Sequence, residues 1–256
     1  MTRKKPTRLG WKIKRSVLAR TMARRDIRFD NFYQNENVAV FPAIGVIVNR
    51  IKKSGNTSVV AFLDELERQV AGDQVTPKNA EDIKNRRRIH LQDPFTILRM
   101  HSFATLVAVR NPYHRSISGF LEKIALGKAL HYRDFPSFGE NSPEAFEVFL
   151  KSLKQNHFFG DRHFFPQTAL MFQPKEHYTK VARLETLVHD MGAFLDQIGQ
   201  DPTRAAALKQ PHKLERDQIG KIQNSTSKEH YLTSRAVELI EDLYHSDFEV
   251  LGYEKR

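Results

Sequence analysis

The stretch IVNRIKKSGNTSVVAFL at residues 47–63 constrains the fold more than any other part of this 256-residue chain. An apolar run rich in β-branched residues stops at Asn49, a basic loop around Gly55 follows, and an apolar run of helical character begins at Val59. Glycine lets the backbone take a positive φ and approach a ligand closely, and a helix N-terminus attracts anions. The pattern predicts a strand, a glycine turn and a helix start that bind an anion.

Strands and helices are predicted to alternate along the rest of the chain. Strands are predicted within residues 37–51, 105–110 and 178–184, and helices at residues 57–71, 112–126, 144–155, 186–198 and 233–247. The near-continuous apolar run TLVAVR at 105–110 is typical of a parallel strand that is buried on both faces. The alternation therefore predicts one α/β domain with a central parallel β-sheet flanked by helices.

The positive charge of the chain is concentrated at its N-terminus. Of the formal net charge of +11, residues 1–28 carry eleven Lys and Arg against one Asp, so the remaining 228 residues carry only +1. We predict a basic N-terminal arm over residues 1–36, solvated or loosely packed, and one domain over residues 37–256. A short basic amphipathic helix in the arm would suit peripheral contact with a membrane or another polyanion through residues 1–28. Nucleic acid is the disfavoured partner, because a nucleic-acid-binding domain usually spreads its charge over a folded face.

Composition excludes several classes of protein. The chain has no cysteine, which rules out a disulfide framework and thiolate metal sites. No apolar run approaches the roughly 20 residues that span a bilayer, and the N-terminus lacks the apolar core of a secretory signal. These features predict a cytoplasmic protein with a possible peripheral membrane contact, although the Arg-rich, acid-poor arm also resembles an organelle transit peptide. The scattered histidines match no zinc motif, so we expect no metal.

A second anion-binding pattern occurs in VRNPYHRSISGF at residues 109–120. Arg110 follows a predicted strand, where open α/β sheets place their ligands, and Asn111 with Pro112 is typical of a helix start. Ser118 lies two turns into that helix, with Arg115 three residues before it on the same side. An arginine at a strand end and a hydroxyl from the next helix can hold a second phosphate.

Together, KKSGNTS and the spacing R-x7-S between Arg110 and Ser118 resemble the two nucleotide-binding motifs of sulfotransferases that use 3′-phosphoadenosine 5′-phosphosulfate (PAPS). The likeness extends to the carbohydrate sulfotransferases of the chondroitin 4-O- and HNK-1 type, over roughly residues 44–253. It is carried by FEVFLKSL (146–153), RHFFPQTALM (162–171), YTKVARLETLVHDMGAFLDQIG (178–199), IQNSTSKEHY (222–231) and LIEDLYHSDFEVLGY (239–253).

This resemblance implies a single P-loop-like sulfotransferase domain, with PAPS as the sulfuryl donor, no metal, and an oligo- or polysaccharide as the acceptor. The chain departs from the family pattern at Lys52, where proline is usual, at Asn56, where Gly, Cys or Ser is usual, and at Phe164, where Trp is usual. The cysteines and the membrane anchor of animal relatives are absent, which resembles a soluble bacterial form. Acceptor choice therefore does not transfer from the animal enzymes.

The resemblance also implies roles for single residues. Lys53 would neutralise charge on the bridging oxygen as the phosphate leaves. The 5′-phosphate would be cradled by Ser54, Gly55, Asn56, Thr57 and Ser58, and the 3′-phosphate would be held by Arg110 and Ser118. An acceptor hydroxyl needs a general base, for which histidine is suited near neutral pH. His163, in the position of the family's H-W-x-P-Q segment, is the first candidate, His90 is the second and His101 the third.

Two other functions remain open on sequence grounds. A nucleotide-dependent kinase on a P-loop-type fold would also use a strand, a glycine loop and a helix start. It is disfavoured because the first glycine of the G-x-x-x-x-G-K-[ST] motif is missing and Lys53 precedes Gly55. Alternatively, the departures at Lys52 and Asn56 would suit a polyanion-binding protein that uses its basic arm and keeps a degenerate nucleotide site.

Overall fold

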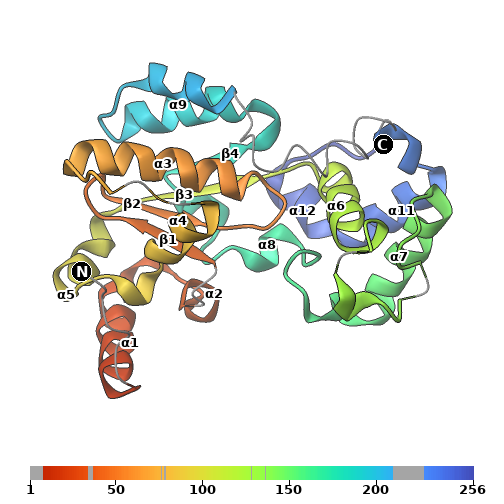
Figure 1. Cartoon of the computed structure of the whole chain (residues 1–256), viewed down its shortest axis with the longest axis horizontal. Coiled ribbons are helices and arrows are strands. Elements are labelled where there is room, and N and C mark those ends of the chain that lie inside the picture. Colours follow the sequence, from red (N-terminus) through yellow and green to blue (C-terminus); the bar gives the residue numbers. More distant parts are fainter. Residues whose placement is uncertain are drawn as a thin grey trace. The chain divides into compact units, whose positions relative to one another are not determined.

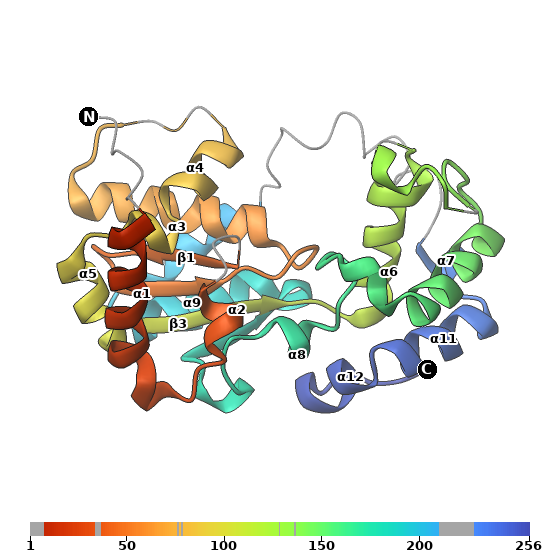
Figure 2. The same cartoon turned by 90° about the horizontal axis from the view of Figure 1, so that it is seen from below.

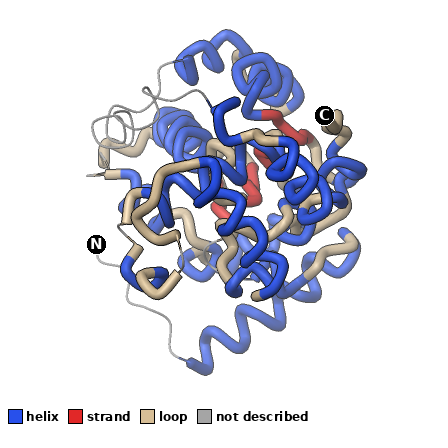
Figure 3. The backbone as a smooth tube through the Cα atoms, turned by 90° about the vertical axis from the view of Figure 1, so that its right-hand side faces the viewer, coloured by secondary structure: helices blue, strands red, loops and turns tan. Residues whose placement is uncertain are grey.

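The structure is a computed structural model that describes residues 8–33, 37–75, 77, 79–127, 129–135, 137–209 and 228–256. The described chain forms two compact units. The first comprises the described residues of 1–51, 55–109 and 171–210, and the second comprises those of 52–54, 110–170 and 211–256. Most of the described chain is helical, and the strands belong to the first unit (Figure 3).

A four-stranded sheet forms the centre of the first unit, with strand order β1-β2-β3-β4. The strands are β1 (Val38–Phe41), β2 (Val46–Asn49), β3 (Ala104–Val109) and β4 (Lys180–Arg183). β2, β3 and β4 are parallel, whereas β1 pairs antiparallel with β2. The single strand predicted within residues 37–51 is wrong in this respect. Pro42 lies in the turn that separates two strands, and the turn ends at Gly45 with a φ of +64°.

Period-2 alternation explains how the sheet is covered. Alternate residues of the strands pack against α3 (Asn56–Ala71) and α9 (Leu187–Gln197), which lie on one side of the sheet (Figure 1). This core contains Ala39, Phe41, Val46, Val48, Leu106, Ala108 and Ala182 from the strands, and Val59, Leu63, Met191 and Phe194 from the two helices. Gly72, directly after the predicted helix at residues 57–71, ends α3 in the left-handed conformation.

The remaining helices of the first unit are short apart from the first. They are α1 (Arg8–Met22), α2 (Phe29–Tyr33), α4 (Ala80–Arg86) and α5 (Pro94–Arg99), and α1 lies next to α5 (Figure 2). The helix expected in the basic arm is therefore present, but Leu18 and Met22 are buried, so it is not simply solvated. Within the described residues, no helix is both long enough and apolar enough to cross a membrane.

The second unit contains only helices and loops among its described residues. Its helices are α6 (Pro112–Phe120), a π-helical continuation (Leu121–Ala125), α7 (Pro143–Gln155), α8 (Gln167–Leu170), α11 (Ser234–Leu243) and α12 (His245–Leu251). The predicted final helix at 233–247 is instead two helices that meet at Tyr244. Phenylalanine and tyrosine rings fill the core of this unit, among them Phe120, Phe146, Phe149, Phe164 and Tyr231.

The predicted fold class is confirmed. The chain has a mixed α/β fold in which a mostly parallel central sheet is flanked by helices. The predicted domain boundary between residues 36 and 37 stays a prediction.

Candidate active site

The loop that follows β2 has an unusual backbone. Lys53 has a φ of +67° and Gly55 a φ of +77°, so both are in the left-handed region. A Cβ atom on Gly55 would lie 2.8 Å from Cδ1 of Leu184. Residue 55 must therefore be a glycine for two reasons, its φ and the close approach of Leu184.

In the first unit, α3 begins directly after Gly55, which has no side chain that could cap the first N–H groups of the helix. The neighbouring side chain of Asn56 is engaged elsewhere, because its Oδ1 accepts a hydrogen bond of 3.3 Å from Nε of Arg50. Thr57 and Ser58 are partly exposed in the first turn. The positive end of the helix dipole therefore lies at partly exposed residues, and anion binding there stays a prediction.

In the second unit, buried side chains fix the backbone of residues 52–54. Nε of Arg115 donates to the carbonyl of Lys52 at 3.1 Å, and Nη1 of Arg110 lies 3.3 Å from the carbonyl of Lys53. Arg115 is 1% exposed and also donates to the carbonyls of Phe165 and Arg162. Burial lowers the pKa of Arg115. Arg115 therefore fixes the loop backbone through hydrogen bonds from its guanidinium group. The sequence indicated only that it lies on the same side of the helix as Ser118.

Within the second unit, Gln167 joins this loop to the backbone of Arg110. Its Oε1 accepts hydrogen bonds of 2.8 Å from both Oγ of Ser54 and the backbone N–H of Arg110. Its Nε2 donates to the carbonyl of Arg110 at 2.8 Å and to Oδ2 of Asp247 at 3.2 Å. Gln167 is fully buried. One side chain thus connects the two segments that the sequence assigns to two separate anionic groups.

The helix after Arg110 starts as predicted. Oδ1 of Asn111 accepts a 3.0 Å hydrogen bond from the N–H of Tyr113, and Pro112 opens α6. Ser118 is 6% exposed within this helix, in the same unit as Arg110. The predicted pair thus belongs to one unit, with Arg110 immediately before α6 and Ser118 inside it.

His163 belongs to a hydrogen-bonded chain of three residues in the second unit. Oδ1 of Asp161 lies 2.7 Å from Nδ1 of His163 and accepts its backbone N–H at 2.8 Å. The hydroxyl of Tyr132 donates to Oδ2 of the same carboxylate. Because an ionised carboxylate only accepts, Nδ1 carries a proton and Nε2 of the neutral ring is left as the basic atom.

The electrostatics of this chain favour an ionised Asp161. Burial alone would raise the pKa of its carboxyl group, but the hydrogen bonds from His163 and Tyr132 outweigh burial and hold the pKa well below its ordinary value. Burial, followed by the hydrogen bond to Asp161, raises the pKa of Tyr132.

Lys53 and Glu122 form an ion pair in the second unit, between Nζ and Oε2. Glu122 belongs to the π-helical segment that continues α6. Burial raises the pKa of Glu122, but the charge and hydrogen bond of Lys53, followed by the charge of Lys123, outweigh burial, so that the pKa lies below its ordinary value. Lys53 is therefore paired with a carboxylate that the sequence did not single out.

The other two candidate histidines lie in the first unit. His90 is in a short 3₁₀ helix (Ile89–Leu91), and its carbonyl lies 3.4 Å from Nζ of Lys14. His101 is exposed, and its Nδ1 lies 2.7 Å from the carbonyl of Leu98. Of the three, only His163 is found in the same unit as Lys53. Across the described part of the chain, no group of three or more His, Cys, Asp or Glu side chains is arranged to hold a metal ion.

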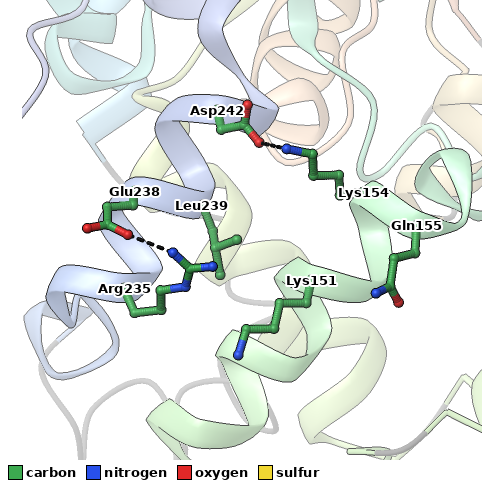
Figure 4. Close-up of a pocket in the computed structure, with 7 residues that line it drawn as sticks. All are labelled: Lys151, Lys154, Gln155, Arg235, Glu238, Leu239 and Asp242. Carbon is green, nitrogen blue, oxygen red and sulfur yellow. Dashed lines mark hydrogen bonds and ion pairs between the residues drawn. The ribbon is translucent and has the colours of Figure 1, made fainter.

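A pocket of about 370 Å³ lies between α7 and α11 of the second unit (Figure 4). It is lined by Lys151, Lys154, Gln155, Arg235, Glu238, Leu239 and Asp242. One ion pair, from Lys154 to Asp242, joins α7 and α11 across the pocket, and a second, of 2.8 Å from Arg235 to Glu238, lies along α11. None of the residues predicted for anion binding or catalysis lines it.

Comparison with known families agrees with the motifs. The model of a family described as the sulfotransferase family matches residues 36–254, which is most of the chain. Among curated proteins and solved structures, no match to the chain is found. The match begins ahead of β1 and ends two residues before the C-terminus, and so includes both anion-binding motifs and the segment of His163. The chain belongs to the sulfotransferase family.

Proposed function

We propose that the protein transfers a sulfuryl group from PAPS to a hydroxyl of a carbohydrate acceptor. The observation that carries this proposal is the hydrogen-bonded connection through Gln167, which fixes Ser54 of the glycine loop to the backbone of Arg110. Two basic side chains, Lys53 and Arg110, thereby project from one rigid backbone arrangement. A donor with separate 5′ and 3′ phosphate groups requires such an arrangement.

The residues present suit this donor. The proposal assigns the 5′-phosphate to Lys53 and to the loop and helix start formed by Ser54, Gly55, Asn56, Thr57 and Ser58. The uncapped start of α3 and the glycine at residue 55 favour a phosphate there. The hydroxyl of Ser54 already donates to Gln167, so its backbone N–H is the group expected to face the phosphate. Arg110 and Ser118 are assigned to the 3′-phosphate.

His163 is the proposed general base. PAPS supplies an activated sulfuryl group: a bond forms between the acceptor oxygen and sulfur while the bond from sulfur to the bridging oxygen breaks, and that electron pair stays on the phosphate. Nε2 of His163 takes the proton of the acceptor hydroxyl, and Asp161 stabilises the resulting imidazolium through Nδ1. Lys53 stabilises the negative charge on the departing phosphate.

The carbohydrate class of the acceptor rests on the family resemblance and on the residues next to His163. Phe158 and Phe159 are partly exposed, and His157, Phe158 and Phe159 all have φ values between +45° and +56°. Left-handed backbone costs roughly 1–2 kcal/mol for each residue that carries a side chain. Such strain tends to persist at binding sites, and partly exposed rings offer an apolar face to a sugar.

Thermal unfolding with adenosine 3′,5′-bisphosphate tests the donor site. At a hundredfold excess over Kd, a ligand that binds only the folded state adds about 2.7 kcal/mol, which corresponds to a rise in Tm of roughly 5–10 °C. We expect this rise with the bisphosphate and a much smaller one with AMP. Arg110→Ala should abolish the difference, whereas Arg133→Ala, which removes an exposed arginine of the same unit, should not.

Two results would contradict the proposal. A larger rise with ATP and magnesium than with the bisphosphate would indicate a kinase. No rise with any nucleotide would indicate a degenerate site and leave polyanion binding by the N-terminal arm as the function. For catalysis, His163→Asn should abolish sulfuryl transfer while bisphosphate binding persists. If His90→Asn abolishes transfer and His163→Asn does not, the assignment of the base is wrong.

A further inference from the structure

The ammonium group that the proposed function assigns to the leaving phosphate is already paired in this structure. Nζ of Lys53 donates to Oε2 of Glu122, and the two side chains are 14% and 32% exposed. An ion pair at this depth is less screened by solvent than a surface pair. A phosphate that binds Lys53 must therefore compete with the carboxylate of Glu122.

The backbone of each partner is fixed by its surroundings, so the two side chains start from defined positions. On one side, Arg115 and Arg110 bind the carbonyls of Lys52 and Lys53, and Lys53 has a left-handed φ of +67°. On the other side, Glu122 is the second residue of a π-helical segment, and π-helical insertions frequently occur at functional sites.

Glu122 has another cation beside it if Lys53 turns away. Its Oε1 lies 3.4 Å from Nζ of Lys123. The carboxylate would therefore not be left buried and unpaired, a situation that usually costs several kcal/mol. Exchange of Lys53 between Glu122 and a phosphate is consequently inexpensive.

We propose that Glu122 is an exchange partner and positioning residue for Lys53: its carboxylate holds the ammonium in the donor-free enzyme and competes with the donor's phosphate for it. This inference rests on the proposed function.

Two effects of opposite sign follow for Glu122→Gln. Removal of the competing charge should tighten binding of adenosine 3′,5′-bisphosphate by about two- to fivefold, the range expected for losing one partly exposed ion pair. Turnover should fall by about tenfold or more, because Lys53 loses the carboxylate that orients its ammonium group. A residue that only supports the fold would not improve ligand binding while it lowers kcat.

The test is calorimetric titration of the full chain with adenosine 3′,5′-bisphosphate, together with kcat and KM for sulfuryl transfer. Glu140→Gln is the matched control, because Glu140 is an exposed carboxylate of the same unit and the change in charge is identical. Glu122→Asp keeps the negative charge and should bind the bisphosphate like the wild type. In a Lys53→Gln background, the tightening caused by Glu122→Gln should vanish, since there is no ammonium left to compete for.

The outcomes separate this inference from the proposed function. Tighter binding in Glu122→Gln that depends on Lys53, with lower kcat, supports the exchange. The exchange is overturned if the wild-type chain binds the bisphosphate and Glu122→Gln binds it with the same affinity. It is also overturned if the tightening persists without Lys53. Either result leaves the proposed function intact. If the wild-type chain does not bind the bisphosphate at all, both fail.

Discussion

At the scale of single residues, Asp161 shows how one carboxylate can define the chemistry of a histidine. Its two oxygens accept from the ring and backbone of His163 and from the hydroxyl of Tyr132, and these bonds outweigh the effect of burial on its pKa. The carboxylate therefore stabilises the folded state and also keeps the proton of His163 on Nδ1. Its contribution to stability has a pH dependence whose sign can be derived.

We predict that Asp161→Asn lowers the free energy of unfolding by about 1.5–3 kcal/mol at pH 7, as for hydrogen bonds to a charged group. The pKa of Asp161 is lower in the folded state than its unfolded value of about 3.9, so the stabilisation is complete above that value. It is lost as the pH falls from about 4 toward the folded pKa, and the difference between wild type and variant should shrink there.

Urea unfolding of both proteins at a series of pH values measures this difference. Asp134→Asn provides the control, because the side chain of Asp134 is 93% exposed and should show little effect at any pH. A wild-type–variant difference that stays constant down to pH values below 4 would show that the loss comes from packing and not from the charge of Asp161.

At the scale of secondary-structure elements, α12 holds the start of α8 and, through it, the glycine loop. Asp247 of α12 is fully buried and accepts hydrogen bonds from the N–H groups of Gln167 and Thr168 at 2.8 and 2.9 Å. It also accepts from the side chains of the same two residues. The aspartate of the C-terminal segment LIEDLYHSDFEVLGY thus acts as a cap supplied by a distant part of the chain.

We predict that Asp247→Asn lowers the free energy of unfolding by roughly 2–4 kcal/mol, because the amide nitrogen of Asn would face donors in a buried site. Bisphosphate affinity should also fall, since Gln167 loses its support. The control is Asp242→Asn in α11, whose side chain is 54% exposed and paired with Lys154, and which should change stability by less than about 1 kcal/mol. Equal losses in the two variants, measured by urea unfolding, would contradict this role of Asp247.

Elements with a clear hydrophobic period could be predicted from the sequence. α3, α7 and α9 lie within one residue of the predicted bounds, because each has one apolar face and a recognisable start or stop signal. The hairpin of β1 and β2 could not, since its apolar residues run almost without a break across Pro42. Nor could the break at Tyr244, where the apolar pattern is continuous although the backbone is not.

Residues of the candidate site could be predicted only where they occupy a position in a local sequence motif. Gly55, Lys53 and Arg110 occupy motif positions, whereas Glu122 and Asp161 gain their neighbours through folding across long sequence separations. Glu122 pairs with a residue 69 positions earlier, and Tyr132 bonds to Asp161 across 29 positions. A single sequence contains no signal for such pairs. Gln167 stands in a family segment, but nothing local indicates the four hydrogen bonds of its side chain.

At the scale of the whole molecule, the chain separates a basic N-terminus from a nearly neutral remainder. Residues 1–28 carry +10 of the net charge of +11. Within α1, Lys12 and Arg20 are exposed while Leu18 is buried. One face of this helix therefore contributes to the core, and the other presents cations to solvent. Deletion of the arm would confuse the two roles, whereas substitution of the exposed residues alone separates them.

We predict that Lys12→Gln combined with Arg20→Gln weakens binding to vesicles of phosphatidylcholine and phosphatidylserine by roughly fivefold per charge, or about 1 kcal/mol each. Tm and bisphosphate affinity should stay unchanged, because neither side chain is in the core or near the glycine loop in sequence. The matched pair Arg133→Gln and Lys151→Gln removes two exposed charges outside the arm and should leave vesicle binding intact. Equal loss in both pairs, measured by vesicle sedimentation, would show that net charge and not the arm governs membrane contact.

Leu18→Ala should have the opposite effect to the arm variant. It should lower the free energy of unfolding by about 2–5 kcal/mol, while vesicle binding of the folded protein persists.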